Sequence, residues 1–196
     1  MSINNVPSLL INAGLLVAVF CLSAATQAAD EYSDALKVFK ESPVVKVYFT
    51  NSYGYAVFPT IGKGGIGIGG AYGKGQVYKG GNVTGRTSMT QVTIGFQLGG
   101  QAYSQIIFFQ DKRSFDEFTS GNFEFGAQAS AIAITAGAQA QAGTGGSTAG
   151  ASAGPGEPGK QIGHYNKGMV VFSHAKGGLM YEASLGGQKF SYEPIK

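Results

Sequence analysis

The chain has 196 residues, which is enough for one domain with a substantial core. Charged residues make up only 13% of it, about half the share that is usual in globular proteins. The formal net charge of +3 is too small to indicate nucleic acid as a partner. Two histidines, one cysteine and no tryptophan leave few reactive side chains, so we expect neither an enzyme nor a bound cofactor.

The start of the chain has the pattern of an export signal. Residues 9–25 are largely apolar, and Thr26-Gln27-Ala28 fits the small-x-small cleavage rule. We therefore expect a signal peptide over residues 1–28 and a mature chain that begins at Ala29, located in the periplasm or associated with the cell envelope. An uncleaved membrane anchor is the alternative, although Asn12 interrupts the apolar run.

Two short helices are predicted next. The first covers residues 30–41, and its apolar residues fall on one stripe with helical spacing: Tyr32, Ala35, Leu36 and Phe39. Ser42-Pro43 is typical of an N-cap followed by the first helical residue, so a second helix should run to about residue 51. Its buried side is expected to comprise Val44, Val47 and Tyr48.

From Tyr53 the apolar pattern changes to a period of two, which predicts strands. The first strand should end at Pro59. Glycine-spaced residues 62–75 and residues 101–109 predict two more. Between them lies a half-buried strand whose apolar residues alternate with polar ones and glycine: Val92, Ile94, Phe96 and Leu98.

The second half of the chain is less regular. Ser114 is predicted to cap a short helix, and residues 123–133 alternate again. The tract of small residues from about 140 to 160 predicts a mobile loop. Met169–Phe172 and Leu179–Leu185 should form a final hairpin, which Phe190 and Tyr192 would extend.

Together these elements predict a single α+β domain over residues 29–196. Its sheet should be mainly antiparallel, curved or barrel-like, and preceded by short N-terminal helices. The density of glycine supports this prediction, because strand glycines allow sharp bends and close approach between backbones.

The glycine spacing does not point to a nucleotide site. Gly62-x-Gly64-x-x-Gly67 matches the dinucleotide-binding spacing, but strand-like flanks surround it and no acid follows before Asp111. Gly75 stands where a phosphate-binding loop would need Ser or Thr after Gly73-Lys74. His164 and His174 have no cysteine or HExxH motif beside them, so no metal site is expected.

Three motifs, in the right order, resemble the SYLF family. Residues 53–59 (YGYAVFP) and 63–75 (KGGIGIGGAYGKG) resemble its N-terminal core. Residues 95–101 (GFQLGGQ) resemble its central Gly-x-Gln-x-Gly segment, and residues 177–187 are similar to its closing Gly-Leu-x-x-x-x-Ser-Leu-x-Gly motif. The resemblance extends over the whole expected mature chain.

The resemblance implies a lipid-binding module. Eukaryotic members of the family bind membranes that contain phosphoinositides, aided by an amphipathic N-terminal helix, and fungal members also bind actin. Neither is an expected partner of an exported bacterial chain, so anionic phospholipid at a membrane surface is the ligand that the resemblance transfers. The alternative is a structural or self-associating envelope protein without specific lipid binding.

The lysines supply the candidate lipid-binding residues. Residues 30–41 carry four acids and two lysines, whereas residues 44–86 carry five cations and no acid. A stretch of one sign can steer a protein toward an anionic surface, although dispersed cations also serve solubility alone. We expect headgroup contacts from the first helix and from the strand loops, with aromatic rings inserted shallowly beside them. The candidates are Lys37, Lys40, Lys46, Lys63, Lys74 and Lys79.

Overall fold

The structure is a computed structural model that describes residues 30–95, 100–126, 129, 131–134, 164–176 and 185–195. The predicted signal peptide, the predicted loop over 140–160 and most of the Leu179–Leu185 strand lie outside these residues. Those three predictions therefore stay predictions.

Two helices precede the sheet, as predicted. The first covers residues 30–41, and the second, α2, runs from Pro43 to Asn51 with Ser42 at its N-cap. The predicted apolar stripe of the first helix is confirmed, since all four of its residues pack in one core cluster. The predicted buried side of α2 is wrong in part. Val45 and Tyr48 are buried, whereas Val44 and Val47 are 38% and 53% exposed, because one position along a helix turns the face by about 100°.

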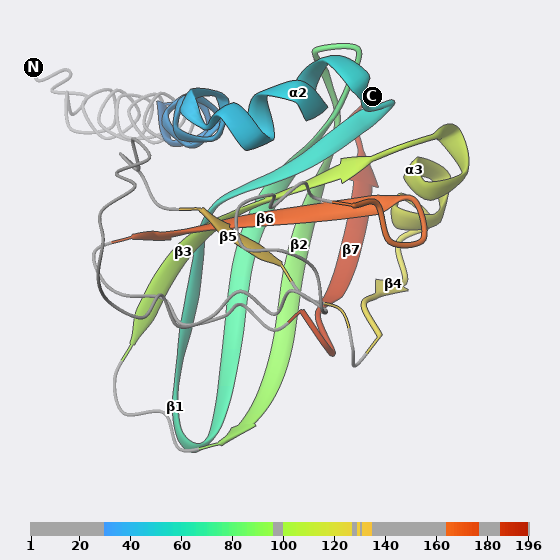
Figure 1. Ribbon diagram of the computed structural model, residues 1–196. Helices are drawn as coiled ribbons and strands as arrows, with labels where there is room; N and C mark the ends of the chain where they lie inside the picture. Colours follow the sequence, from blue (N-terminus) through green and yellow to red (C-terminus); the bar gives the residue numbers. More distant parts are fainter. Residues whose placement is uncertain are drawn as a thin grey trace, which may run out of the picture.

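The described strands form one sheet, in the order β4-β7-β2-β1-β3-β6-β5 (Figure 1). Their bounds are β1 Gly54–Lys79, β2 Asn82–Gly95, β3 Gln101–Phe109, β4 Phe123–Glu124, β5 Ile132–Ile134, β6 Met169–Lys176 and β7 Lys189–Pro194. Their pairings are antiparallel except that between β5 and β6, which is parallel. The predicted α+β class, with a mainly antiparallel curved sheet and short N-terminal helices, is confirmed.

β1 turns back on itself. Its first arm, residues 54–63, pairs with β3, and its second arm, residues 67–79, pairs with β2. The two arms lie side by side (Figure 1), and a Cβ added at Gly54 would stand 2.6 Å from the carbonyl oxygen of Tyr78. The reversal needs Gly65, because its φ is +151° and a Cβ there would lie 2.2 Å from the Cα of the residue at 69. We call the second arm of β1 together with β2 the β1–β2 ribbon.

Two glycines of the second arm face the core, where larger side chains of the first arm cover them. A Cβ at Gly73 would lie 2.6 Å from Cγ1 of Ile61, and one at Gly75 would lie 2.7 Å from the ring of Phe58. A large side chain of the first arm thus fills the space above each of these glycines. Since both glycines point inward, the residues that alternate with them point to the other face of the sheet.

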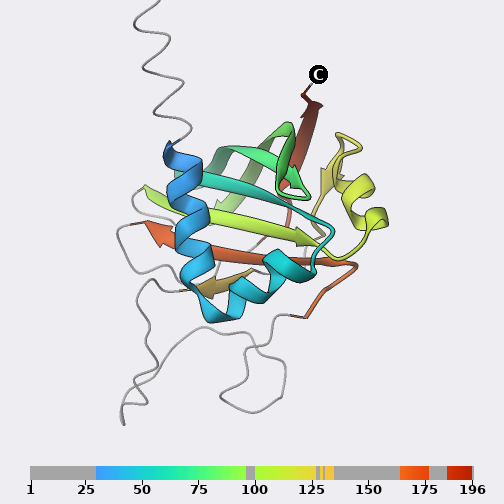
Figure 2. The same ribbon diagram turned by 90° about the horizontal axis from the view of Figure 1, so that it is seen from above.

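Both faces of the sheet carry a core. The outer face lies beneath the N-terminal helices, which cross β1, β3 and β6 in Figure 2. Its core includes Phe39, Tyr48, Val57, Phe108 and Phe172. The inner face packs against α3 (Lys112–Phe118). Its core includes Phe58, Ile61, Met89, Phe109, Phe118 and Phe190.

Side chains from distant strands meet across the inner face. Gln105 on β3 and Gln188, which precedes β7, are fully buried. Their side-chain amides donate hydrogen bonds to each other at 3.0 and 3.3 Å. Gln188 also donates to the hydroxyl of Tyr103 at 3.3 Å. Because β2 and β1 separate β7 from β3 in the sheet, this contact requires the sheet to curl.

Two predicted boundaries in the first half of the chain are wrong. Pro59 does not end a strand; it lies at a bulge, where the pairing register with β3 shifts between Phe58 and Ile61. A bulge tolerates the missing N–H of proline. The N-cap of α3 is Asp111 rather than Ser114, which occupies the third helical position and completes a capping box.

Two pairings in the second half also differ from the prediction. Residues 123–133 contribute two short strands, β4 and β5, to opposite edges of the sheet rather than one alternating strand. Phe190 and Tyr192 lie in β7, which pairs with β2 and β4, so they do not extend a hairpin with β6. β6 pairs instead with β3 and β5.

Candidate functional site

Three large apolar side chains are exposed next to one another on the β1–β2 ribbon. The exposed fraction is 73% for Ile68, 51% for Tyr72 and 76% for Val92. Val92 is the cross-strand partner of Gly70, and Ile68 and Tyr72 stand two residues to either side of that glycine. All three therefore point to the outer face. Exposed apolar side chains that adjoin in this way are typical of an interaction surface.

Lys74 borders these side chains on the same face. It is exposed, follows Tyr72 by two residues on β1, and has Ser88 as its cross-strand partner. We call Ile68, Tyr72, Lys74 and Val92 the ribbon face. None of the acids in the described part of the chain is a cross-strand partner of these residues. Those acids are Asp30, Glu31, Asp34, Glu41, Asp111, Asp116, Glu117, Glu124 and Glu193.

The buried and exposed sides of β2 are the opposite of those that the alternating pattern predicts. Val92 was expected on the buried side, but Gln91 is buried, with 5% of its surface exposed, and its side-chain amide donates to the carbonyl oxygen of Gly186 at 2.8 Å. Ile94 lies in β2, but its side chain, like Phe96 and Leu98, is outside the described part of the chain. Because Gln91 takes the inward position, the neighbouring Val92 faces outward.

The six predicted lysines do not form one surface. Lys37, Lys40 and Lys46 are exposed on the N-terminal helices. Lys63 ends the first arm of β1 near the reversal, whereas Lys79 stands at the turn into β2, at the far end of the second arm. Lys74 is the member of the predicted set that lies on the ribbon face.

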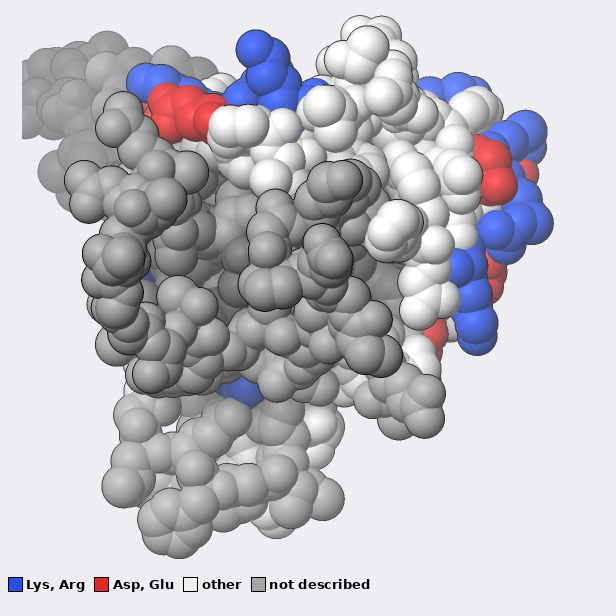
Figure 3. All heavy atoms as spheres, in the orientation of Figure 1, with Lys and Arg blue, Asp and Glu red and all other residues white. Residues whose placement is uncertain are grey.

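Two of the predicted lysines, Lys40 on the first helix and Lys79 at the end of β1, already contact aromatic rings. Nζ of Lys40 lies 5.4 Å from the centre of the Phe49 ring, and Nζ of Lys79 lies 4.9 Å from that of Tyr53. The surface of the first helix also carries acids, and blue and red atoms lie side by side over it in Figure 3. Its charges partly cancel, so this helix offers an anionic membrane less attraction than its lysines alone suggest.

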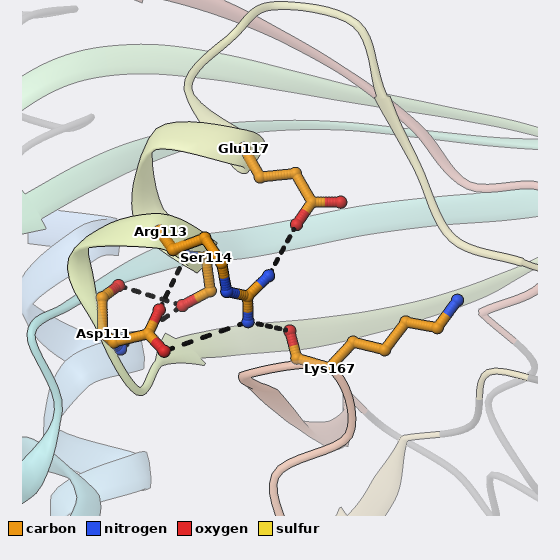
Figure 4. A network of polar contacts seen from close by, with 5 residues as sticks. All are labelled: Asp111, Arg113, Ser114, Glu117 and Lys167. Carbon is orange, nitrogen blue, oxygen red and sulfur yellow. Dashed lines mark hydrogen bonds and ion pairs between the residues drawn. The ribbon is translucent and has the colours of Figure 1, made fainter.

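A second group of polar residues gathers where α3 begins, and its contacts are structural (Figure 4). The carboxylate of Asp111 accepts the backbone N–H of Ser114 at 2.8 Å. The guanidinium of Arg113 lies 3.3 Å from the carboxylate of Glu117 and donates to the carbonyl oxygen of Lys167 at 3.1 Å. These bonds cap the helix and hold the turn before β6 against it.

This cap predicts an acid-dependent loss of stability. The hydrogen bond from the Ser114 backbone, more than any other contact, holds the pKa of Asp111 below its ordinary value of 3.8. The folded state therefore binds fewer protons than the unfolded state. The stabilisation that the ionised Asp111 cap contributes is fully present above the ordinary pKa. It is lost as the pH falls through the pKa of Asp111 in the folded state.

We expect Asp111→Asn to be less stable than wild type near neutral pH. The difference between the two proteins in the free energy of unfolding should become smaller in acid. Urea denaturation of both proteins across this pH range measures the gap. A gap that stays constant as the pH falls well below 3.8 would contradict the assignment.

The described residues show neither a metal-ligand cluster nor a membrane-spanning helix. Within them, no three or more His, Cys, Asp or Glu side chains gather where they could hold a metal ion. None of the helices in the same part of the chain is both long enough and apolar enough to cross a bilayer.

The sequence reasoning missed most of the ribbon face. Lys74 was among the predicted lipid-binding residues, but Val92 was expected on the buried side of its strand. The available signal was glycine itself. When every second residue of a strand is Gly or Ala, as at 69, 71, 73 and 75, the larger residues between them can face solvent.

Two comparisons relate the chain to known proteins. The model of the Ysc84 family, described as "Las17-binding protein actin regulator", matches residues 90–193. Beta cell expansion factor A of Aeromonas veronii is 28% identical over 107 residues, which cover 50% of this chain and 38% of that protein. The chain thus matches well under half the length of this relative.

The family match begins within β2 and runs through β7. It includes Val92 but not the β1 residues of the ribbon face, which precede it in the sequence. The matched segment covers more than half of the chain. This chain therefore belongs to the Ysc84, or SYLF, family.

Proposed function

We propose that this chain is exported and binds anionic phospholipid at a membrane surface of the cell envelope through its ribbon face. The observation that carries the proposal is the adjoining exposure of Ile68, Tyr72 and Val92. Family membership supports a lipid-binding or related role in general. The export signal read from residues 1–28 supports the location.

The chemistry of the ribbon face suits the boundary between headgroups and acyl chains. Ile68 and Val92 supply apolar surface, and full burial of such a side chain stabilises by about 1.5–3 kcal/mol. Tyr72 combines an apolar ring with a hydroxyl that can remain among the headgroups. Lys74 can place its ammonium near anionic phosphates while its stem lies along apolar surface. A lysine near an anionic membrane contributes about 1 kcal/mol, which salt weakens.

A triple variant tests the proposal. In co-sedimentation with phosphatidylglycerol vesicles, we expect the purified wild-type protein to bind at low salt and to bind less at high salt. Ile68→Ser/Tyr72→Ser/Val92→Ser should lose at least about tenfold in affinity, which corresponds to about 1.4 kcal/mol. The fold should persist, because all three side chains are mostly exposed.

The matched control is Val44→Ser/Val47→Ser, which removes exposed apolar side chains from α2. It should leave vesicle binding unchanged. If both variants lost the same vesicle affinity, the effect would not be specific to the ribbon face. That result would contradict the assignment of lipid contact to this face. Absence of vesicle binding by wild type, together with oligomers that grow with concentration, would favour the self-associating alternative.

A further inference from the structure

Thr60 lies on the outer face of the sheet, beside the ribbon face. Two strand segments near it, β6 and the second arm of β1, each carry a lysine there. The ammonium of Lys176, at the end of β6, donates to the Thr60 hydroxyl at 2.7 Å. Lys176 belongs to the strand that pairs with β3, and β3 pairs with the first arm of β1. Its side chain therefore reaches across β3 to Thr60, and both residues are exposed.

Lys74 lies on the second arm of β1, which runs along the other side of the same threonine. A Cβ at Gly73 would lie 3.0 Å from the carbonyl oxygen of Thr60, so the second arm of β1 passes directly beside that residue. Gly73 and Gly75 face the core, and the side chain of Lys74 between them projects on the outer face. We call Thr60, Lys74 and Lys176 the Thr60 cluster.

The positive charge of this cluster is not neutralised within the described part of the chain. Among those residues, neither Lys74 nor Lys176 lies within ion-pair distance of a carboxylate. His174, two residues before Lys176 on the same face of β6, has a pKa held below its ordinary value by burial and by the charge of Lys176. Like charges gathered without an acid favour the binding of an anion.

The donors present suit a phosphate. The Thr60 hydroxyl accepts a hydrogen bond from Lys176, so its own hydrogen remains available for an acceptor. Each ammonium has three hydrogens to donate, and charge-assisted bonds to phosphate oxygens are about twice as strong as neutral ones. The neighbouring hydroxyl of Ser104 is already used, because it donates to the carbonyl oxygen of Pro59 at 2.7 Å.

We propose that the Thr60 cluster is a subsite for a phosphate-ester anion, with the Thr60 hydroxyl and the ammonium groups of Lys74 and Lys176 as its donors. This inference rests on the proposed function, because the ribbon face next to it would hold the apolar part of the same lipid. The shared chemistry is a phosphate oxygen, and its source is either a phospholipid headgroup or a soluble phosphoester.

The variants distinguish a subsite that needs the Thr60 hydroxyl from a surface that attracts anions through its positive charge alone. Thr60→Val removes the hydroxyl without changing charge, and Thr60→Ser retains it. Lys176→Gln is matched by Lys167→Gln, which removes an exposed lysine from the turn before β6. Binding to phosphatidylglycerol vesicles is measured for each. NMR titration with glycerol phosphate, followed at the backbone amides near residue 60, covers the soluble source.

We expect Lys176→Gln to lose about fivefold in vesicle affinity, the factor that corresponds to about 1 kcal/mol. Thr60→Val should also bind vesicles more weakly, whereas Thr60→Ser and Lys167→Gln should bind like wild type. If wild type binds vesicles and Thr60→Val binds equally well, the subsite is overturned and the proposed function still stands. The same conclusion follows if Lys176→Gln and Lys167→Gln bind vesicles with equal affinity.

The two NMR outcomes decide between the sources of phosphate. Glycerol phosphate shifts without vesicle binding would support the subsite with a soluble ligand and would overturn the proposed function. Absence of both vesicle binding and shifts would overturn both. Vesicle binding accompanied by the expected losses in the variants supports the headgroup as the source.

Discussion

Phe108→Ala should destabilise the protein by about 3–5 kcal/mol, the usual cost of truncating a fully buried phenylalanine. Phe108 has no exposed surface, and its ring centre lies 5.5 Å from that of Tyr48 and 5.0 Å from that of Phe49, both on α2. It also contacts the rings of Tyr55 and Phe172 at 5.8 and 6.1 Å. The side chain thus joins α2 to three strands on the outer face, namely β1, β3 and β6.

Urea denaturation measures this loss, and hydrogen exchange shows where it acts. Because Phe108 anchors α2, amides of the two helices should exchange faster than those of β3. Val83→Ala is the control, since Val83 is 38% exposed near the turn between β1 and β2. Its effect should stay within about 0.5 kcal/mol. A Phe108→Ala loss no larger than that of the control would contradict the packing described for the outer face.

Gln188→Leu should be destabilising alone but much less so when Gln105→Leu accompanies it. The single change leaves the buried amide of Gln105 and the hydroxyl of Tyr103 without the partner that joins them. Each buried polar group left unpaired costs about 1–3 kcal/mol. The double change replaces both amides by apolar groups of similar shape, which can be nearly neutral.

A double-mutant cycle measures the coupling between the two glutamines. Groups that share a buried hydrogen-bond pair usually couple by about 0.5–3 kcal/mol. Additive losses in the cycle would mean that the amides do not depend on each other. In that case the curl of the sheet would have to be held by apolar contacts such as that between Phe58 and Phe190, whose ring centres lie 5.6 Å apart.

Local patterns predict several elements of this fold well. The stripe on the helix over residues 30–41 and strand β3 over residues 101–109 match the structure. The helix has a single apolar stripe to bury, whereas β3 is buried on both faces along most of its length. The α+β class follows from the same elements, because short helices and period-two strands with many bends leave few other arrangements.

The same patterns do not predict which strands pair with each other or which face of each strand is buried. Alternation around Val92 shows that a strand has two faces, but which face is buried depends on what the neighbouring arm supplies. Phe58 and Ile61 fill the space over Gly73 and Gly75, so the core needs no large residue there. The Thr60 cluster is equally hidden, because Lys176 reaches Thr60 from a strand more than a hundred residues away in the sequence.

The lysine prediction shows the same limit. It took cations from one stretch of sequence, yet Lys63 lies near the reversal of β1 and Lys79 at the far end of its second arm. Lys176 was not included because it follows the stretch of one sign. What joins Lys74 to Lys176 is the order of strands in the sheet, which depends on pairings between distant segments.

The most direct test of lipid contact by the ribbon face uses tryptophan fluorescence, since the chain contains no tryptophan. Tyr72→Trp places a single reporter on that face, and Val83→Trp places one near the turn between β1 and β2. With phosphatidylglycerol vesicles, the emission of Tyr72→Trp should shift to shorter wavelength and be quenched by brominated acyl chains, whereas that of Val83→Trp should not change. An unchanged Tyr72→Trp spectrum under conditions in which the protein sediments with vesicles would contradict the account.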